Sequence, residues 1–285
     1  IADFLGNFEG TAVDRVSKKS LFPAIHSAFG LGMLLGAGGA SLAIDAGWSL
    51  ADNYSLVAVV VAVVSVWGSL QFPRRDRPLA RPRGEERKMS LGVWKEKRTL
   101  MVAIIGFSFI MAEISAGTWV PIALTVSGFS GSAAAFAFGM FWIVITFGRL
   151  IGGFVVEKIG RYRTILLSTL ITSSGILIFM LVEVIALPFV GLVLWGLGMS
   201  MGFPMSVAAM SDEPRKAPYR INMIITVVYI SSITVGPALG SLGEVTGIYV
   251  AFSIPLALMI LSAILSPATK PLETPEATSE ESVRT

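Results

Sequence analysis

One carboxylate lies inside a long apolar run and has the clearest potential for chemistry in this sequence. Glu113 is the only charged residue between Thr99 and Leu124, and the only one well inside any of the runs described below. An ionised carboxylate in such a run is costly unless it faces a polar cavity, pairs with a cation or holds a proton. Glu113 is therefore a candidate for proton coupling or for binding substrate hydroxyls. The alternative is a buried hydrogen bond to a neighbouring helix.

Three further residues are candidates for the same site. Trp119 follows Glu113 in the same run and is suited either to stacking on a sugar face or an aromatic compound, or to anchoring at the membrane interface. Asp3 and Asn7 are four positions apart and so share one face of a helix. They either line a cavity or cap a helix end. We take Glu113, Trp119, Asp3 and Asn7 as candidate substrate or proton-coupling residues.

The runs that carry these residues predict an integral membrane protein. The chain is 54% hydrophobic and only 14% charged, whereas a soluble domain carries about 25% charged residues. Apolar runs of about 20 residues are long enough to cross a bilayer, and only helices satisfy their own backbone there. We predict an all-α protein of about eight complete transmembrane helices plus a partial one. The predicted spans are 21–44, 55–72, 99–124, 131–154, 164–182, 186–210, 221–243 and 247–269.

The charges orient these spans. All 22 Lys and Arg residues fall on one side of the predicted membrane, whereas the opposite loops hold Asp45, Asp52, Glu183 and Glu244 and no cation. The positive-inside rule makes the basic side cytoplasmic. We therefore expect a multi-pass protein of the cell membrane whose 73–98 linker and C-terminus are cytoplasmic. The basic linker is expected to contact lipid headgroups and to include an interfacial stretch near Leu91–Trp94.

A short segment between the fourth and fifth spans contains a known pattern. It reads Gly153-x-x-x-Glu157-Lys158-x-Gly160-Arg161-x-Arg163. This resembles the G-x-x-x-D-R-x-G-R-R loop signature of the major facilitator superfamily, found between the second and third helices of each six-helix half. Glu157 and Lys158 replace the usual Asp and Arg and keep their charges.

An acid and several cations in a tight turn can form an ion-pair and helix-dipole latch. The alternative is a turn that merely carries positive-inside charges. The candidate latch also includes Arg149, which is predicted in the last turns of the preceding span. Its members are Gly153, Glu157, Lys158, Gly160, Arg161, Arg163 and Arg149.

The resemblance implies a domain organisation. Residues 1–72 would be the remainder of the N-terminal six-helix half, with the end of helix 4 followed by helices 5 and 6. Residues 73–98 would be the cytoplasmic linker, 99–269 the C-terminal half and 270–285 a disordered cytoplasmic tail. The missing N-terminal helices of the same protein would complete the bundle. The stretch from Glu113 to Trp119 is similar to the corresponding helix of fucose-permease-type sugar porters.

The function that the resemblance implies is secondary active transport of a small solute by alternating access. We expect coupling to protons and favour a sugar-like substrate. One alternative is efflux of hydrophobic or cationic drugs by proton antiport, in which Trp119, Phe141 and Trp142 supply an apolar cavity. Another, from a different class, is a non-transporting membrane receptor or scaffold.

Other functional classes are disfavoured by the residue content. There is no cysteine and a single histidine, His26, so the sequence indicates no metal site, no cofactor and no enzyme activity. The basic residues lie in loops between spans, which disfavours a nucleic-acid partner. The expected partners are the small solute, protons and the lipid bilayer.

Overall fold

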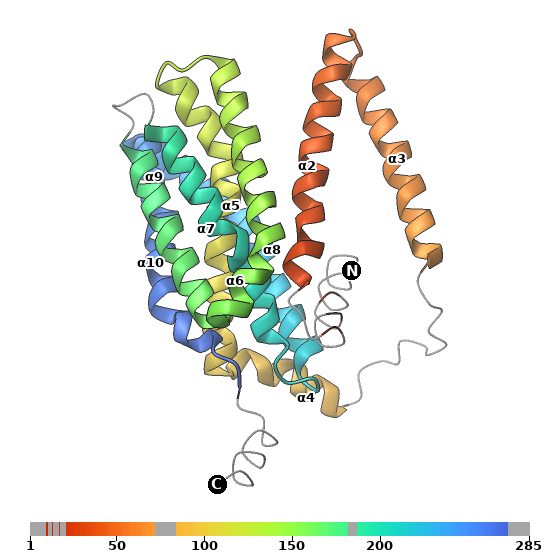
Figure 1. The fold of residues 1–285 in the computed structure, drawn as a ribbon, viewed down its shortest axis with the longest axis vertical. Coiled ribbons are helices and arrows are strands. Elements are labelled where there is room, and N and C mark those ends of the chain that lie inside the picture. The colour runs from red at the N-terminus through yellow and green to blue at the C-terminus, as the bar shows by residue number, and fades with distance from the viewer. Residues whose placement is uncertain are drawn as a thin grey trace.

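The structure is a computed structural model, which describes residues 10, 13, 17, 21–71, 84–181 and 187–272. Across these residues the regular elements are all helices, as predicted (Figure 1). In chain order they are α2 (Phe22–Asp45), α3 (Leu50–Gln71), α4 (Gly84–Gly92), η1 (Val93–Lys95), α5 (Lys97–Val126), α6 (Gly131–Met180), α7 (Leu187–Met210), α8 (Ala217–Thr246), α9 (Ile248–Ala251), α10 (Ser253–Leu265) and η2 (Ser266–Thr269).

Long apolar helices dominate this part of the chain. Within the described ranges, six helices are long and apolar enough to cross a membrane, and they include α3, α5, α6, α7 and α8. The sixth runs through α9, α10 and η2 as one segment, Ile248–Thr269. The predicted span 21–44 coincides with α2, and the two predicted spans 131–154 and 164–182 both fall within α6. The predicted all-α membrane fold is therefore confirmed.

The 50-residue helix α6 is two helices joined at a sharp reversal. Gly160 has φ 77° and ψ 162°, a backbone conformation that is open to glycine and strained for other residues. Gly160 thus ends the first arm of α6, and Arg161 begins the second. This is the turn that the loop signature predicted between two spans.

Helix α7 packs closely against both arms of α6. A Cβ atom added to Gly148 on the first arm would lie 2.5 Å from Ser200, and one added to Gly175 on the second arm would lie 2.3 Å from the backbone nitrogen of Trp195. Only glycine permits such an approach of two helix backbones in a membrane. Along the second arm the contacts run in the opposite direction to α7, since Gly191 lies against Phe179.

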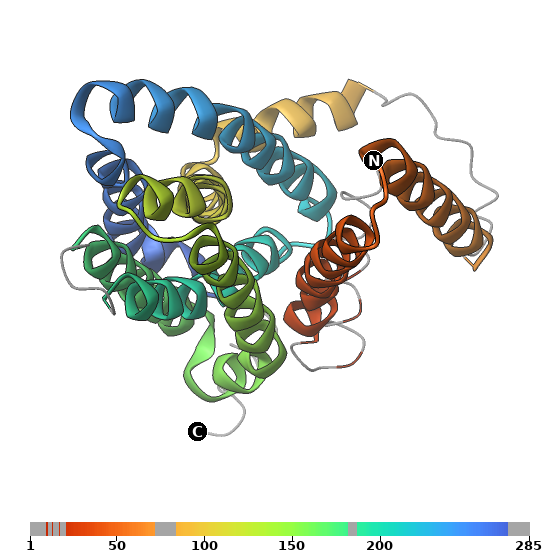
Figure 2. The same ribbon diagram turned by 90° about the horizontal axis from the view of Figure 1, so that it is seen from above.

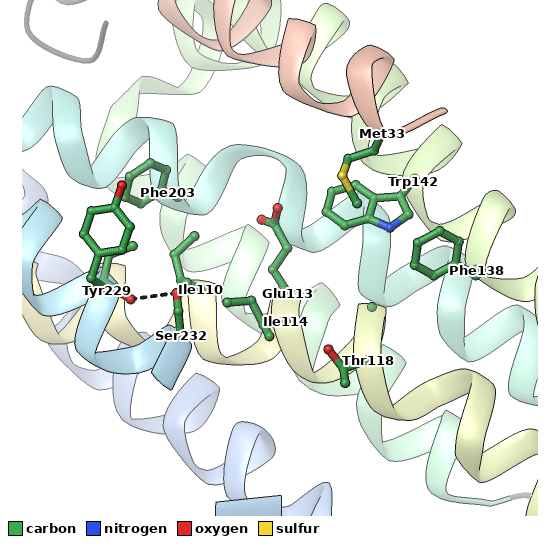
Figure 3. Close-up of a pocket in the computed structure, with 12 residues that line it drawn as sticks. Met33, Ile110, Glu113, Ile114, Thr118, Phe138, Trp142, Phe203, Tyr229 and Ser232 are labelled. Carbon is green, nitrogen blue, oxygen red and sulfur yellow. Dashed lines mark hydrogen bonds between the residues drawn. The ribbon is translucent and has the colours of Figure 1, made fainter. Parts of the chain in front are cut away.

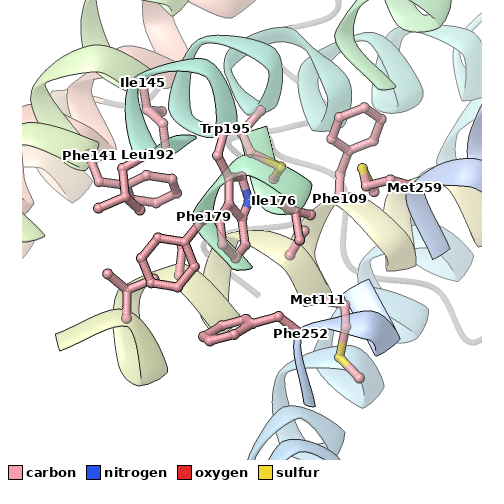
Figure 4. Close-up of a cluster of buried hydrophobic side chains, with 14 of the residues drawn as sticks. Phe109, Met111, Phe141, Ile145, Ile176, Phe179, Leu192, Trp195, Phe252 and Met259 are labelled. Atoms are coloured by element: carbon pink, nitrogen blue, oxygen red, sulfur yellow. The ribbon is translucent and has the colours of Figure 1, made fainter. Parts of the chain in front are cut away.

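An aromatic cluster forms the centre of this packing (Figure 4). The indole of Trp195 on α7 is fully buried and lies edge-on to the rings of Phe141, Phe179 and Phe252, with centroid separations of 6.1, 6.0 and 5.7 Å. Edge-to-face packing of this kind adds to the stabilisation that burial alone provides. The cluster therefore joins both arms of α6 to α7 and to the start of α10.

The first two long helices differ in how they contact the rest. Helix α2 packs on the first arm of α6, where Gly30 approaches the side chain of Thr146. Helix α3 meets α2 at the turn that joins them and stands away from α5, α6, α7 and α8 (Figures 1 and 2). Its described residues are exposed except for the half-buried Asn53 and Gly68.

Candidate functional site

The candidate site is a cavity of about 430 Å³ beside the middle of α5. Its lining comes from α2, α5, the first arm of α6, α7 and α8. Figure 3 shows the carboxylate of Glu113 pointing from α5 into this space, with Met33 and Trp142 on one side and Phe203 and Tyr229 on the other. The full lining is Met33, Ile110, Glu113, Ile114, Gly117, Thr118, Phe138, Trp142, Phe203, Val228, Tyr229 and Ser232.

Glu113 forms a buried ion pair behind the cavity wall. The Nη2 atom of Arg149, on the first arm of α6, donates a hydrogen bond to Oε2 of Glu113 over 2.9 Å. The side chain of Arg149 is 0% exposed and that of Glu113 is 6% exposed. Removing one partner of such a pair leaves an uncompensated buried charge, which costs about 3–5 kcal/mol. The two side chains therefore depend strongly on each other.

This position corrects the expectation for Arg149. The first arm of α6 continues past residue 154 to Gly160, so Arg149 lies deep in the helix rather than in its last turns. It contacts Glu113 instead of the loop residues. Glu113 is therefore not the only charged residue well inside a span. Sequence alone gave no sign of this pairing, because the two residues lie on different helices.

Only one of the three nitrogen atoms of the Arg149 guanidinium donates a hydrogen bond to a described residue. Its Nε and Nη1 atoms are buried and have no hydrogen-bond partner among the described residues. Buried donors are normally paired with protein or ordered water. The pair is thus held at one nitrogen only, which leaves Arg149 able to take a second acceptor.

Aromatic rings form much of the cavity wall, and Trp142 is the indole that lies beside Glu113 (Figure 3). Trp142 packs edge-on to Phe138, with a centroid separation of 6.3 Å. The hydroxyls of Thr118, Tyr229 and Ser232 provide polar groups on the same wall. The cavity can therefore offer a carboxylate, hydroxyls and flat apolar surfaces to one small molecule.

Trp119 is not part of the lining of this cavity, and its ring lies against Gly240 on α8. Its Nε1 atom is buried without a hydrogen-bond partner among the described residues. Of the aromatic residues proposed for an apolar cavity, Trp142 lines it, whereas Phe141 packs in the core beside Trp195. Asp3 and Asn7 lie outside the described residues.

A second set of charges lies at the end of the bundle where α6 reverses. Arg161 donates two hydrogen bonds to Asp212, in the loop after α7, over 2.8 and 2.7 Å. Its Nε atom also donates to the carbonyl of Thr269, over 2.6 Å. Arg98, at the start of α5, donates to the same carboxylate over 2.5 Å. Asp212 therefore joins α5, the α6 turn and the end of η2 through two arginines.

The other residues of the candidate latch lie differently. Glu157, Lys158 and Arg163 are exposed, and none of the ion pairs seen among the described residues involves them. Gly160 supplies the reversal, and Gly153 is half-buried on the first arm. The sequence analysis did not identify Asp212 as the acceptor, because the segment that contains it attracts attention through its cations, Arg215, Lys216 and Arg220.

A neighbouring network is built around Glu96, just before α5. Its Oε2 atom accepts hydrogen bonds from Thr99 and Arg220, both over 2.7 Å, and its Oε1 atom lies 3.0 Å from the ammonium of Lys216. Burial opposes ionisation of this carboxyl, but the three hydrogen bonds outweigh it and hold the pKa of Glu96 below its ordinary value. Glu213 also pairs with Arg220, over 3.2 Å.

Comparison with known proteins places this geometry in a family. Residues 24–219 match the family model described as Major Facilitator Superfamily. An uncharacterised MFS-type transporter of Yersinia pestis is 27% identical over 268 residues, which cover 93% of this chain and 68% of that protein.

Two solved structures share the fold. One is the transporter FucP in its outward conformation, with a TM-score of 0.65 and 15% identity over 92% of this chain and 72% of that one. The other is a single-residue variant of the E. coli fucose:proton symporter FucP, with a TM-score of 0.66 and 15% identity over 89% and 68% of the two chains.

Proposed function

Since this chain belongs to the Major Facilitator Superfamily of secondary transporters, we propose that it moves a small solute across the membrane by proton-coupled alternating access, with Glu113 as the proton-coupling group. Glu113 supports this role because it is a carboxylate in the cavity wall, close to the middle of α5, with one oxygen held by Arg149. The chain is thus a multi-pass membrane protein, and its proposed cargo is a small solute together with a proton.

Protonation of Glu113 would change the balance of the buried pair. A neutral carboxyl attracts the Arg149 guanidinium less strongly, so the contact between α5 and the first arm of α6 weakens. Loss of the proton restores the pair. The two protonation states therefore favour different spacings of these two helices, and a ligand that prefers one spacing is coupled to the proton by the same free energy.

Glu113→Gln in the protein expressed from its complete gene tests this role. Gln keeps the size and an acceptor for Arg149 but cannot exchange a proton. We expect solute uptake in proteoliposomes to lose its dependence on a pH gradient, and solute-driven proton flux to disappear. Thr118→Val, which removes a hydroxyl from the same cavity wall, should weaken the affinity for the solute but retain both the pH dependence and the proton flux. Proton flux that persists unchanged in Glu113→Gln would rule out the coupling role.

A sugar-like molecule is the substrate that we favour. Such a molecule has hydroxyls on its edges and apolar faces on its rings. Glu113, Thr118 and Ser232 offer hydrogen bonds to the edges, while Trp142 offers a face for stacking. This choice is supported by the fold that the chain shares with FucP, a fucose:proton symporter. We expect Trp142→Leu to raise the apparent KM for a transported sugar more than Trp142→Phe does.

Efflux of hydrophobic or cationic compounds by proton antiport is the second candidate. It is favoured by the apolar part of the lining, which includes Met33, Ile114 and Phe203. Efflux of a lipophilic dye cation from loaded vesicles, measured beside uptake of a panel of labelled sugars, separates the two substrate classes. Dye efflux that depends on Glu113, without sugar uptake, would replace the first candidate by the second.

A further inference from the structure

The short helix α4 has a different orientation from the membrane-spanning helices. It runs across the ends of the spans, between the described end of α3 and the start of α5 (Figure 1). Val93, in the adjoining η1, is 1% exposed and packs in the cluster that α5 and α8 share. The segment is therefore anchored to the bundle through Val93 and lies across its end, where the bilayer surface would be.

The outer face of this segment carries exposed apolar side chains. Leu91 is 60% exposed and Trp94 is 41% exposed. They are three positions apart and so lie on the same side of the chain. Trp residues are enriched where the bilayer meets water, because the indole is amphipathic.

Exposed lysines flank these two side chains. Lys88 lies three positions before Leu91 on α4, which puts these two on one face, and Lys95 directly follows Trp94 at the end of η1. Lys97 is exposed nearby. These lysines take part in none of the ion pairs seen among the described residues. Their charges are therefore available to an external anion.

Two acidic residues near this surface, Glu96 and Glu86, are directed elsewhere. The carboxylate of Glu96 is occupied by Lys216 and Arg220 on the bundle side. Glu86 is exposed two positions before Lys88, which is about 200° around a helix and so on the other face. Leu91 and Trp94 thus have exposed lysines beside them, whereas Glu86 and Glu96 lie on other sides of the segment.

We propose that Lys88, Leu91, Trp94 and Lys95 form a binding surface for the headgroups of anionic phospholipids. Leu91 and Trp94 would enter the boundary between headgroups and acyl chains, and the two lysines would extend to the phosphates. Charge complementarity selects this occupant, since a zwitterionic lipid carries no net charge to attract the lysines. This surface is independent of what the cavity transports.

The absence of cysteine from the chain allows a direct test. Leu91→Cys, labelled with bimane, places a single bimane group at position 91 of the chain. The labelled protein is reconstituted in phosphatidylcholine vesicles that contain brominated phosphatidylglycerol or, at the same mole fraction, brominated phosphatidylcholine. We expect stronger quenching by brominated phosphatidylglycerol. The apparent preference of this surface for phosphatidylglycerol over phosphatidylcholine should fall roughly fivefold in Lys88→Gln and again roughly fivefold when Lys95→Gln is added.

A matched control uses exposed cations at another loop. Lys158→Gln with Arg163→Gln removes the same amount of charge from the turn of α6, away from the bimane. The preference for phosphatidylglycerol at Leu91 should remain in that variant. Equal quenching by both brominated lipids, no quenching by either, or a preference that survives loss of both lysines would each overturn the proposal.

Discussion

Arg149 places a guanidinium nitrogen 2.9 Å from a carboxylate oxygen of Glu113, although 36 positions separate them in the chain. The two residues lie on α5 and on the first arm of α6, so the ion pair joins two membrane-spanning segments. Because both side chains are withdrawn from solvent, each is the main compensation for the other's charge.

Removal of one member of this pair should cost more than removal of both. Arg149→Met leaves Glu113 buried without its cation and is expected to destabilise the protein by about 3–5 kcal/mol. In the double variant with Glu113→Gln, no net charge stays buried, so most of that loss should return. Thermal unfolding in detergent, followed by fluorescence-detected size exclusion, measures both. A double variant that is less stable than Arg149→Met would contradict a direct pairing.

Asp212 should control access to the cavity from the end where α6 reverses. Asp212→Asn removes the charge that Arg98 and Arg161 share. A partly exposed ion pair of this kind stabilises the closed arrangement by about 1 kcal/mol. Its loss should therefore shift the equilibrium between the closed state and the state open at that end roughly fivefold toward the open state. Ser232→Cys places a unique thiol in the cavity wall. An impermeant maleimide, added from the Asp212 side, should label it faster in the Asp212→Asn background.

Lys158→Gln is the control for this labelling experiment. Lys158 is exposed at the same turn and belongs to none of the described ion pairs. Its removal should leave the labelling rate of Ser232→Cys unchanged. An equal acceleration in Lys158→Gln would mean that net charge, rather than the Asp212 contacts, controls access.

The Glu96 network should make stability depend on pH at the acid side. The pKa of Glu96 lies below its ordinary value of 4.5, so the folded state favours the ionised carboxyl. The stabilisation is therefore present above about pH 4.5 and is lost as the pH falls through the lowered pKa of the folded state. The difference in Tm between the protein and Glu96→Gln should be constant near neutral pH and disappear in acid. A difference that grows on acidification would contradict this sign.

The close approach of α6 and α7 should tolerate no added methyl group at Gly175. A Cβ there would lie 2.3 Å from the backbone nitrogen of Trp195, which cannot move without moving α7. We expect Gly175→Ala to cost about 1–3 kcal/mol through overpacking. Gly139→Ala is the matched control on the other arm, because nothing lies within 4 Å of its added Cβ. Comparable Tm values for the two variants would refute close packing at Gly175.

The orientation of the chain is a further prediction from its charges. With seven predicted spans between them, an odd number, reporters fused after Asp52 and after Ser279 should lie on opposite sides of the membrane. The fusion at Ser279 should be cytoplasmic, because all Lys and Arg residues fall on its side of the predicted map. Alkaline phosphatase activity at both fusion points would overturn the map.

Much of the fold could be predicted because long apolar runs in a bilayer must be helices. Even the reversal inside α6 was indicated, since Gly160 and the charges around it interrupt the apolar pattern. The rotation of each helix could not be predicted in the same way. A helix that is apolar on every side has no face that the sequence marks as inward, so Trp119 was favoured over Trp142 for the site.

The charged contacts were the least predictable part. The partners of Arg149 and Arg161 are on other helices or loops, and their choice depends on which segments lie side by side. Asp212 and Glu213 were overlooked for the same reason, although each accepts hydrogen bonds from arginine. Glu113, by contrast, could be identified from the sequence, because an acid within an apolar run is conspicuous without any knowledge of its neighbours.

The hairpin of α6, with α7 packed along both of its arms, has a mechanical consequence. Its turn is bound to the loop after α7 by the hydrogen bonds between Arg161 and Asp212. Its two arms pack against α7 at glycines where an added Cβ atom would clash. The two arms of α6 and α7 should therefore move as one rigid body. Arg149 and Trp142 belong to this body and would move relative to Glu113, which belongs to α5. The conformational change of alternating access would then displace the Arg149 guanidinium and the Trp142 indole relative to the Glu113 carboxylate.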